Sequence, residues 1–163
     1  MKIILNGEPV SQARMKHRVI NNFAQVYDPK AKEKADIRLK LVAYIHNYYP
    51  NFVKLEHPKL SFIFHMPILK TTSKKVLPCY HSGIMRHEKK PDIDNLVKLY
   101  LDCLDGILFD GDQKVSLEFC IKLYHAEPKV IIIADESACE LRPVEAGLLA
   151  SSDQSSLVSV VRC

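Results

Sequence analysis

Two neighbouring stretches near the end of the patterned region, 115–124 and 130–134, most constrain what this chain can fold into. Val115, Leu117, Phe119, Ile121 and Leu123 alternate with mostly polar residues, the period of two that is typical of a half-buried strand. Residues 130–134 are wholly apolar and predict a final strand. Two such strands need further strands beside them and a layer of helices over their apolar face.

Helical and strand patterns elsewhere in the chain supply those elements. Residues 2–5 predict a short strand that ends at Asn6-Gly7, and residues 60–66 predict another. A first helix is predicted to open at Asp28-Pro29, with Asp28 as its N-cap. Its expected apolar stripe recurs at helical spacing and consists of Ala31, Ala35, Leu39, Val42, Ile45 and Tyr49.

A second helix is predicted over residues 95–108. Its apolar stripe is Leu96, Leu99, Tyr100, Cys103 and Ile107, and Lys98, Asp102 and Asp105 form its polar side. The expected fold is therefore α+β: a small, mostly antiparallel or mixed four-stranded sheet with two helices on one face, in the order β-α-β-loop-α-β-β.

The length of 163 residues is that of one domain, which we place at residues 1–134, followed by a partly flexible extension over 135–163. No apolar run approaches the roughly 20 residues of a membrane helix. The five cysteines are an odd number without a disulfide framework, which favours a reduced, cytoplasmic protein.

The charge is distributed unevenly along the chain. Residues 1–91 carry 17 Lys and Arg against 6 Asp and Glu, whereas residues 92–134 carry 4 against 8. Basic side chains gather in residues 8–22, which we expect to form a loop or a ragged hairpin, and in an expected loop over 67–90. This asymmetry indicates a polyanion-binding surface around a cation site, or equally a solvated basic face without a partner.

Three aspartates form the main candidate site. Asp92 and Asp94 stand two apart, a spacing that on a strand places both on one face, and Asp112 follows the second helix. Adjacent carboxylates repel unless a cation joins them, and Mg²⁺ takes oxygen ligands. The groups can meet only if the helix is short or the following strand runs back beside its start. The alternative is that Asp94 is an N-cap and that Asp110-Gly111-Asp112 is a turn.

Lys98 lies one helical turn after Asp94 and could stabilise charge that builds on a phosphate. Its alternative is an exposed ion pair with Asp102. A zinc site at Cys79, His81 and His87 lacks a fourth ligand, and the 110–112 segment lacks the closing Glu of a calcium loop. The sequence also has no glycine-rich phosphate loop and no serine nucleophile motif.

A family resemblance is carried by residues 90–98 (KPDIDNLVK) and 101–115 (LDCLDGILFDGDQKV). They resemble the signature of the RusA-like Holliday-junction resolvases, small endonucleases of bacteria and their phages. The N-terminal Gly7-Glu8-Pro9-Val10-Ser11 and the later Tyr27-Asp28-Pro29 are similar to the family's opening. The resemblance covers about residues 1–134.

The resemblance implies a cytoplasmic homodimer that makes paired, Mg²⁺-dependent cuts in four-way DNA junctions. It implies that Asp92, Asp94 and Asp112 bind the metal and that Lys98 is the essential lysine. Family members often carry two adjacent acids at the third position, so Asp110 could share or replace the role of Asp112. No membrane or nucleotide cofactor is expected. We expect the DNA-binding residues to be Arg14, Lys16, Arg18, Lys70, Lys74, Lys75, Arg86, Lys89 and Lys90.

Two other functions stay open at this point. A non-catalytic junction-binding protein would keep the fold, and the separation of Asp110 from Asp112 by Gly111 is its only support. A metal-dependent phosphohydrolase of small substrates is the second, and the basic first half argues against it.

Overall fold

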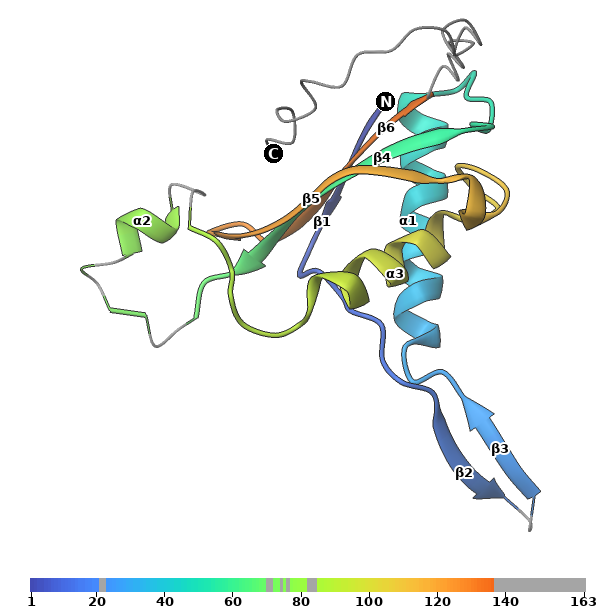
Figure 1. The fold of residues 1–163 in the computed structure, drawn as a ribbon, viewed down its shortest axis with the longest axis horizontal. Coiled ribbons are helices and arrows are strands. Elements are labelled where there is room, and N and C mark those ends of the chain that lie inside the picture. The colour runs from blue at the N-terminus through green and yellow to red at the C-terminus, as the bar shows by residue number, and fades with distance from the viewer. Residues whose placement is uncertain (21–22, 70–71, 74, 76, 82–84, 137–163) are drawn as a thin grey trace, which may run out of the picture.

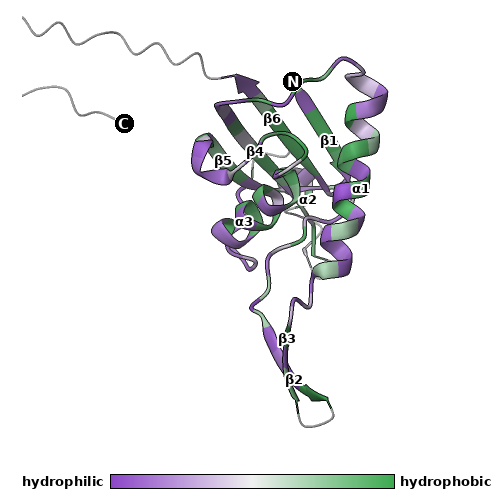
Figure 2. Ribbon diagram, turned by 90° about the vertical axis from the view of Figure 1, so that its right-hand side faces the viewer, coloured by the Kyte–Doolittle hydropathy of each residue, from purple (hydrophilic) through white to green (hydrophobic). Residues whose placement is uncertain are grey.

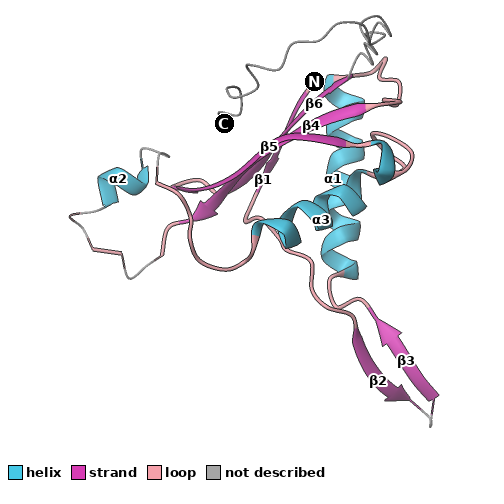
Figure 3. Cartoon of the chain, viewed as in Figure 1, coloured by secondary structure: helices cyan, strands magenta, loops and turns pink. Residues whose placement is uncertain are grey.

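The structure is a computed structural model that describes residues 1–20, 23–69, 72–73, 75, 77–81 and 85–136. Its elements are shown in Figure 1 and, by type, in Figure 3. They are β1 (Lys2–Asn6), β2 (Lys16–Ile20), β3 (Phe23–Tyr27), α1 (Ala31–Tyr48), β4 (Pro58–Pro67), α2 (Leu77–His81), α3 (Ile93–Leu104), the 3-10 turn η1 (Asp112–Lys114), β5 (Ser116–His125) and β6 (Lys129–Glu136).

The main sheet has four strands in the order β1-β6-β4-β5. β6 is antiparallel to both β1 and β4, whereas β4 and β5 are parallel, so the sheet is mixed. The predicted α+β class and four-stranded sheet are confirmed. The structure adds α2 and a separate hairpin of β2 and β3 to the predicted order.

One face of the sheet packs against α1 and α3 (Figures 1 and 2). The register places alternate residues of β4 on this face, opposite the helix-facing residues of β6 and β1. They join the buried faces of both helices in one core, whose fully buried side chains include Ile3, Leu41, Leu60, Phe62, Phe64, Leu96, Leu99, Leu104 and Ile132. This burial holds α3 firmly against the sheet.

The first helix differs from its prediction. It begins at Ala31 with Lys30 rather than Asp28 as N-cap, and Asp28 instead accepts a hydrogen bond of 2.8 Å from the Lys30 amide in the turn before the helix. Its buried residues are Ile37, Leu41 and Ile45, of which only Ile45 belongs to the predicted stripe, and Leu39 is 70% exposed. Apolar residues lie on more than one side of this helix, so the period alone did not identify the buried side.

β5 also departs from its pattern because it is an edge strand with an irregularity near its start. The pairing with β4 shifts by one residue, so that Leu60 faces Leu117 but Ser61 faces Phe119. Leu117 and Phe119 are therefore on opposite faces, and both are substantially exposed. The predicted single buried face of residues 115–123 is wrong.

The two basic segments have different structures. Residues 8–22 contain β2, the first strand of a hairpin that leaves the body of the molecule, as Figures 1 and 2 show, so the predicted alternative of a hairpin is confirmed. Residues 67–90 contain α2. No helix in the described ranges combines the length and apolar character needed to cross a membrane. The expected extension lies almost wholly outside the described residues.

Candidate nuclease site at the start of α3

The N-terminus of α3 carries the first two candidate aspartates. Asp92 is the N-cap, with an extended backbone, and Asp94 lies in the first turn. The expectation that the two share one face of a strand is wrong, as is the alternative that Asp94 is the N-cap. The Asp92 side chain makes no capping hydrogen bond, so its carboxylate is not used to satisfy the helix end.

After α3 ends, the chain turns back, so that β5 runs beside the helix. α3 ends at Leu104, four residues earlier than predicted, and β5 begins at Ser116. A cavity of about 460 Å³ between them is lined by Asp94, Lys98 and Asp112, with apolar side chains including Val97 and Leu117. The geometric requirement set by the sequence is therefore met, because the strand runs back beside the helix.

A second cavity adjoins the first and contains Asp92. It measures about 760 Å³ and shares Ile93, Asp94 and Cys120 with its neighbour. All four predicted catalytic side chains, Asp92, Asp94, Lys98 and Asp112, are exposed and line this pair of cavities. We call the pair the α3–β5 cleft.

The structure separates the roles of Asp110 and Asp112. Asp110 forms an ion pair of 2.6 Å with Lys54 and does not line the α3–β5 cleft. Gly111, with a φ of +88°, makes the turn between them, which its lack of a side chain permits. Asp112 lies on the cleft side of that turn.

The carboxylates do not form a preformed metal cage. Among the described residues, no three His, Cys, Asp or Glu side chains are grouped so that they could hold a metal ion. Mg²⁺, however, commonly keeps several waters and takes one or two carboxylates together with substrate phosphate oxygens. Exposed aspartates that form no ion pair within the described part of the chain fit that mode of binding.

Lys98 is available on the same side of α3 as Asp94. Within the ranges that the structure describes, its ammonium makes no ion pair. The alternative of a Lys98–Asp102 pair is wrong, because Asp102 binds Lys34 of α1 at 2.9 Å. A lysine without an ion pair in the described chain, in a cleft that Asp92, Asp94 and Asp112 also line, can interact with an incoming anion.

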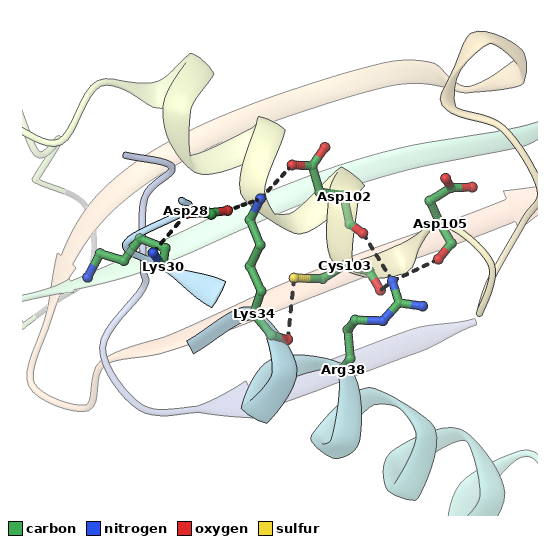
Figure 4. Close-up of polar contacts among 7 residues, drawn as sticks. All are labelled: Asp28, Lys30, Lys34, Arg38, Asp102, Cys103 and Asp105. Atoms are coloured by element: carbon green, nitrogen blue, oxygen red, sulfur yellow. Dashed lines mark hydrogen bonds and ion pairs between the residues drawn. The ribbon is translucent and has the colours of Figure 1, made fainter. Parts of the chain in front are cut away.

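Figure 4 shows the contacts between α1 and α3 that occupy Asp102. Lys34 lies between Asp102 and Asp28, 2.9 and 3.0 Å away. One nitrogen of Arg38 donates to the backbone carbonyls of Asp102, Cys103 and Asp105 at the end of α3. These contacts satisfy carbonyls that the helix leaves unpaired.

The comparison with protein families decides the identity. Residues 6–134 match the family model described as "Endodeoxyribonuclease RusA". The chain belongs to the RusA endodeoxyribonuclease family. This family acts on Holliday-junction DNA, and the expected resemblance is confirmed.

A relative of this RusA-family chain is the "Uncharacterized protein YqaN" of Bacillus subtilis (strain 168). The two are 28% identical over 138 residues, which cover 83% of this chain and 96% of the relative. The likeness extends over most of both chains.

Most of the RusA-family chain's predicted DNA-binding residues are exposed. Arg14 precedes β2, and Lys16 and Arg18 lie on it. Arg86 lines the α3–β5 cleft. The exposed remainder is Lys75, Lys89 and Lys90, whereas Lys70 and Lys74 lie outside the described residues.

Two residues of the cleft, Lys122 and Cys120, were missed from sequence, and a third, His87, was considered only as a zinc ligand. Lys122 of β5 donates hydrogen bonds of 2.6 and 2.9 Å to the carbonyls of Pro91 and Lys89, which fixes the segment before Asp92. His87 is 7% exposed, and its ring packs on Tyr124. Burial is the main cause that lowers the pKa of His87, and the nearby charge of Lys122 lowers it further. Burial raises the pKa of the Cys120 thiol to about 11. Lys122 and Cys120 alternate with apolar neighbours on β5, and that was their only signal.

Proposed function

We propose that this protein is a Mg²⁺-dependent endonuclease that cuts four-way DNA junctions by paired phosphodiester hydrolysis. The observation that carries the proposal is the α3–β5 cleft, where Asp92, Asp94, Lys98 and Asp112 meet although the chain separates the first from the last by 20 positions. Family membership supplies the junction substrate.

Asp94 is the central carboxylate of the proposed site because it lines both cavities of the cleft. It would bind Mg²⁺ together with Asp92 or Asp112, and the phosphate oxygens of DNA would complete the coordination. When bound, the metal would lower the pKa of a coordinated water and neutralise phosphate charge. The N-terminus of α3 adds partial positive charge beside this position, which favours a bound phosphate.

Lys98 would stabilise the charge that develops on the phosphate oxygens in the transition state. Lys98 makes no ion pair within the described chain, and this supports the role. A lysine already bound to a carboxylate would have to break that ion pair before it could contact the phosphate. Lys122 would act as a positioning residue, because it holds the carbonyls of Lys89 and Pro91 directly before Asp92.

A homodimer would account for paired cuts, because a two-fold assembly presents two sites to a four-armed substrate. The face of the sheet opposite α1 and α3 supports it. By register, Ile63 and Ser61 of β4 lie there beside Ile121 and Phe119 of β5 and Ile131 of β6. Phe119 is 43% exposed on this face. The middle of this face, between the Lys59–Asp135 and His65–Lys129 positions of the register, is apolar and suited to pack on a copy of itself.

The test uses a labelled four-way junction and a linear duplex of the same sequence. We expect cleavage of the junction at symmetric positions in Mg²⁺, none in EDTA, and no cleavage of the duplex. Junction binding without cleavage in Mg²⁺ would indicate a non-catalytic binding protein. Release of phosphate from small phosphate esters, with the junction left intact, would indicate a phosphohydrolase.

A further inference from the structure

We propose that the β2–β3 hairpin is a DNA-inserting arm. Its cationic stem would contact phosphates, and the apolar residues next to its turn, Val19, Ile20 and Phe23, would insert between bases at the branch point of a junction and separate them. This inference rests on the proposed function and adds a surface that the nuclease site does not contain.

The hairpin is exposed on all sides of its two strands. It projects away from the sheet and helices in both views of Figures 1 and 2. Among the residues of β2 and β3 only Tyr27 is half-buried. Val19 is 73% exposed and Phe23 is 78% exposed. A hairpin with no packed face gains little stability from its own apolar residues, so these side chains are suited to contact a partner.

On one face of the hairpin, the register places polar and cationic side chains near the stem and apolar side chains next to the turn. Lys16 lies opposite Tyr27, Arg18 opposite Gln25, and Ile20 opposite Phe23 on this face. Arg18 donates a 2.9 Å hydrogen bond to Gln25, and its guanidinium lies 5.1 Å from the centre of the Tyr27 ring. The cations are thus held near the stem, and the apolar pair stands beyond them.

Charge selects the class of partner. Residues 9–27 contain Arg14, Lys16 and Arg18, together with His17, and no Asp or Glu. A second copy of the same cationic hairpin would be repelled at close range. Nucleic acid offers phosphates to the stem and flat apolar bases to the end, and proteins commonly insert apolar side chains between base steps.

Both ends of the hairpin segment are fixed to α3, the helix that carries Asp94 and Lys98. On the entering side, the Gln12 amide donates a 2.8 Å hydrogen bond to the Asn95 carbonyl. On the leaving side, Asp28 binds Lys34, which binds Asp102 (Figure 4). DNA held by the arm would therefore be aligned with the α3–β5 cleft.

The experiment measures 2-aminopurine fluorescence at the branch point of a four-way junction, in EDTA so that no strand is cut. This base brightens when it is unstacked. The variants are Val19→Ser and Phe23→Ser, with Phe23→Trp as the conservative change. Val53→Ser is the matched control, since Val53 is 79% exposed and lies between α1 and β4. Far-ultraviolet circular dichroism checks that each variant is folded.

We expect wild type, Val53→Ser and Phe23→Trp to brighten the probe, and Val19→Ser and Phe23→Ser to brighten it much less. Junction affinity should fall about 5- to 150-fold in Phe23→Ser, the range found when one base-stacking side chain is removed. Junction binding with equal brightening by all variants would overturn the arm and leave the nuclease proposal intact. A wild type that binds no junction would overturn both. Loss of self-association in Phe23→Ser, with brightening unchanged, would assign the tip to a second copy and overturn the DNA role.

Discussion

The ammonium of Lys34 lies 2.9 Å from the carboxylate of Asp102, across the contact between α1 and α3. On the sequence, Asp102 stands one turn after Lys98 and is its natural partner. Because α1 supplies a different lysine, Lys98 faces the α3–β5 cleft without a carboxylate bound to it in the described chain. A packing contact between two helices thus leaves a cation available to the candidate site.

Lys98→Ala should reduce the rate of junction cleavage at saturating DNA by roughly 10²–10³, the loss typical of removing one preorganised charge at a transition state. Lys98→Arg should retain more activity than the Ala variant, since it keeps the charge. Lys114→Ala, an exposed lysine on η1, is the control and should cleave normally. A Lys98→Ala rate within a few-fold of wild type would show that Lys98 is only a surface lysine.

Asp92→Asn should abolish cleavage while junction binding persists. The side chain is exposed and makes no capping hydrogen bond to α3, so the fold does not depend on its charge. Gel-shift titration in EDTA measures binding, and the cleavage assay in Mg²⁺ measures activity. Normal cleavage by a folded Asp92→Asn protein would remove Asp92 from the site.

Lys34→Met should lower the free energy of unfolding by about 1–3 kcal/mol, because it leaves Asp28 and Asp102 without their shared cation. Urea unfolding of Lys34→Met, Asp102→Asn and the double variant measures the coupling. The sum of the losses in unfolding free energy of the two single variants should exceed the loss of the double variant. Additive losses would mean that the two side chains do not stabilise one another.

Stability should fall in mild acid, in part through His65. Its ring stacks on His125 at 4.3 Å, and burial, followed by the charges of His125 and Lys129, lowers its pKa below 6.5. A lowered pKa means that the folded state disfavours protonation, so this contribution is complete above pH 6.5 and is lost as pH falls toward the folded value. His65→Gln should weaken the decline in unfolding free energy between pH 7.5 and 5. His57→Gln, at an exposed position, should keep the wild-type decline.

Phe119→Glu should convert the proposed dimer to monomer, because it places a charge on the apolar sheet face that lacks a helix. Analytical ultracentrifugation measures the mass, and the cleavage assay should show loss of paired cuts. Leu39→Glu is the control, since Leu39 is 70% exposed on α1 at a distance from that face. A dimeric Phe119→Glu protein would place the interface elsewhere.

Strand and helix periods were enough to predict the class of fold, the four-stranded sheet and the second helix. They were not enough where a shift of one residue changes which side chains face the core. The register shift beside Ser61 reverses the facing of β5, and no sequence period reveals it. On α1, Leu39 and Ile37 are equally apolar, and only packing on the sheet decides that Ile37 is buried.

The candidate site could likewise be predicted only in part. The sequence named the aspartates, but their approach depends on α3 ending at Leu104 and on β5 returning beside it. The partners of Lys34 and Lys122 are backbone and side-chain groups distant along the chain, and tertiary contacts of this kind leave no local pattern.

The comparison of Asp112→Asn with Asp110→Asn tests the α3–β5 cleft most directly. The two aspartates flank Gly111, yet Asp112 lines the cleft with Asp94 and Lys98, whereas Asp110 binds Lys54. In a Mg²⁺ cleavage assay on a four-way junction, we predict that Asp112→Asn is inactive and that Asp110→Asn cuts at nearly the wild-type rate. An active Asp112→Asn protein, or an inactive but folded Asp110→Asn protein, would contradict the assignment of catalysis to this cleft.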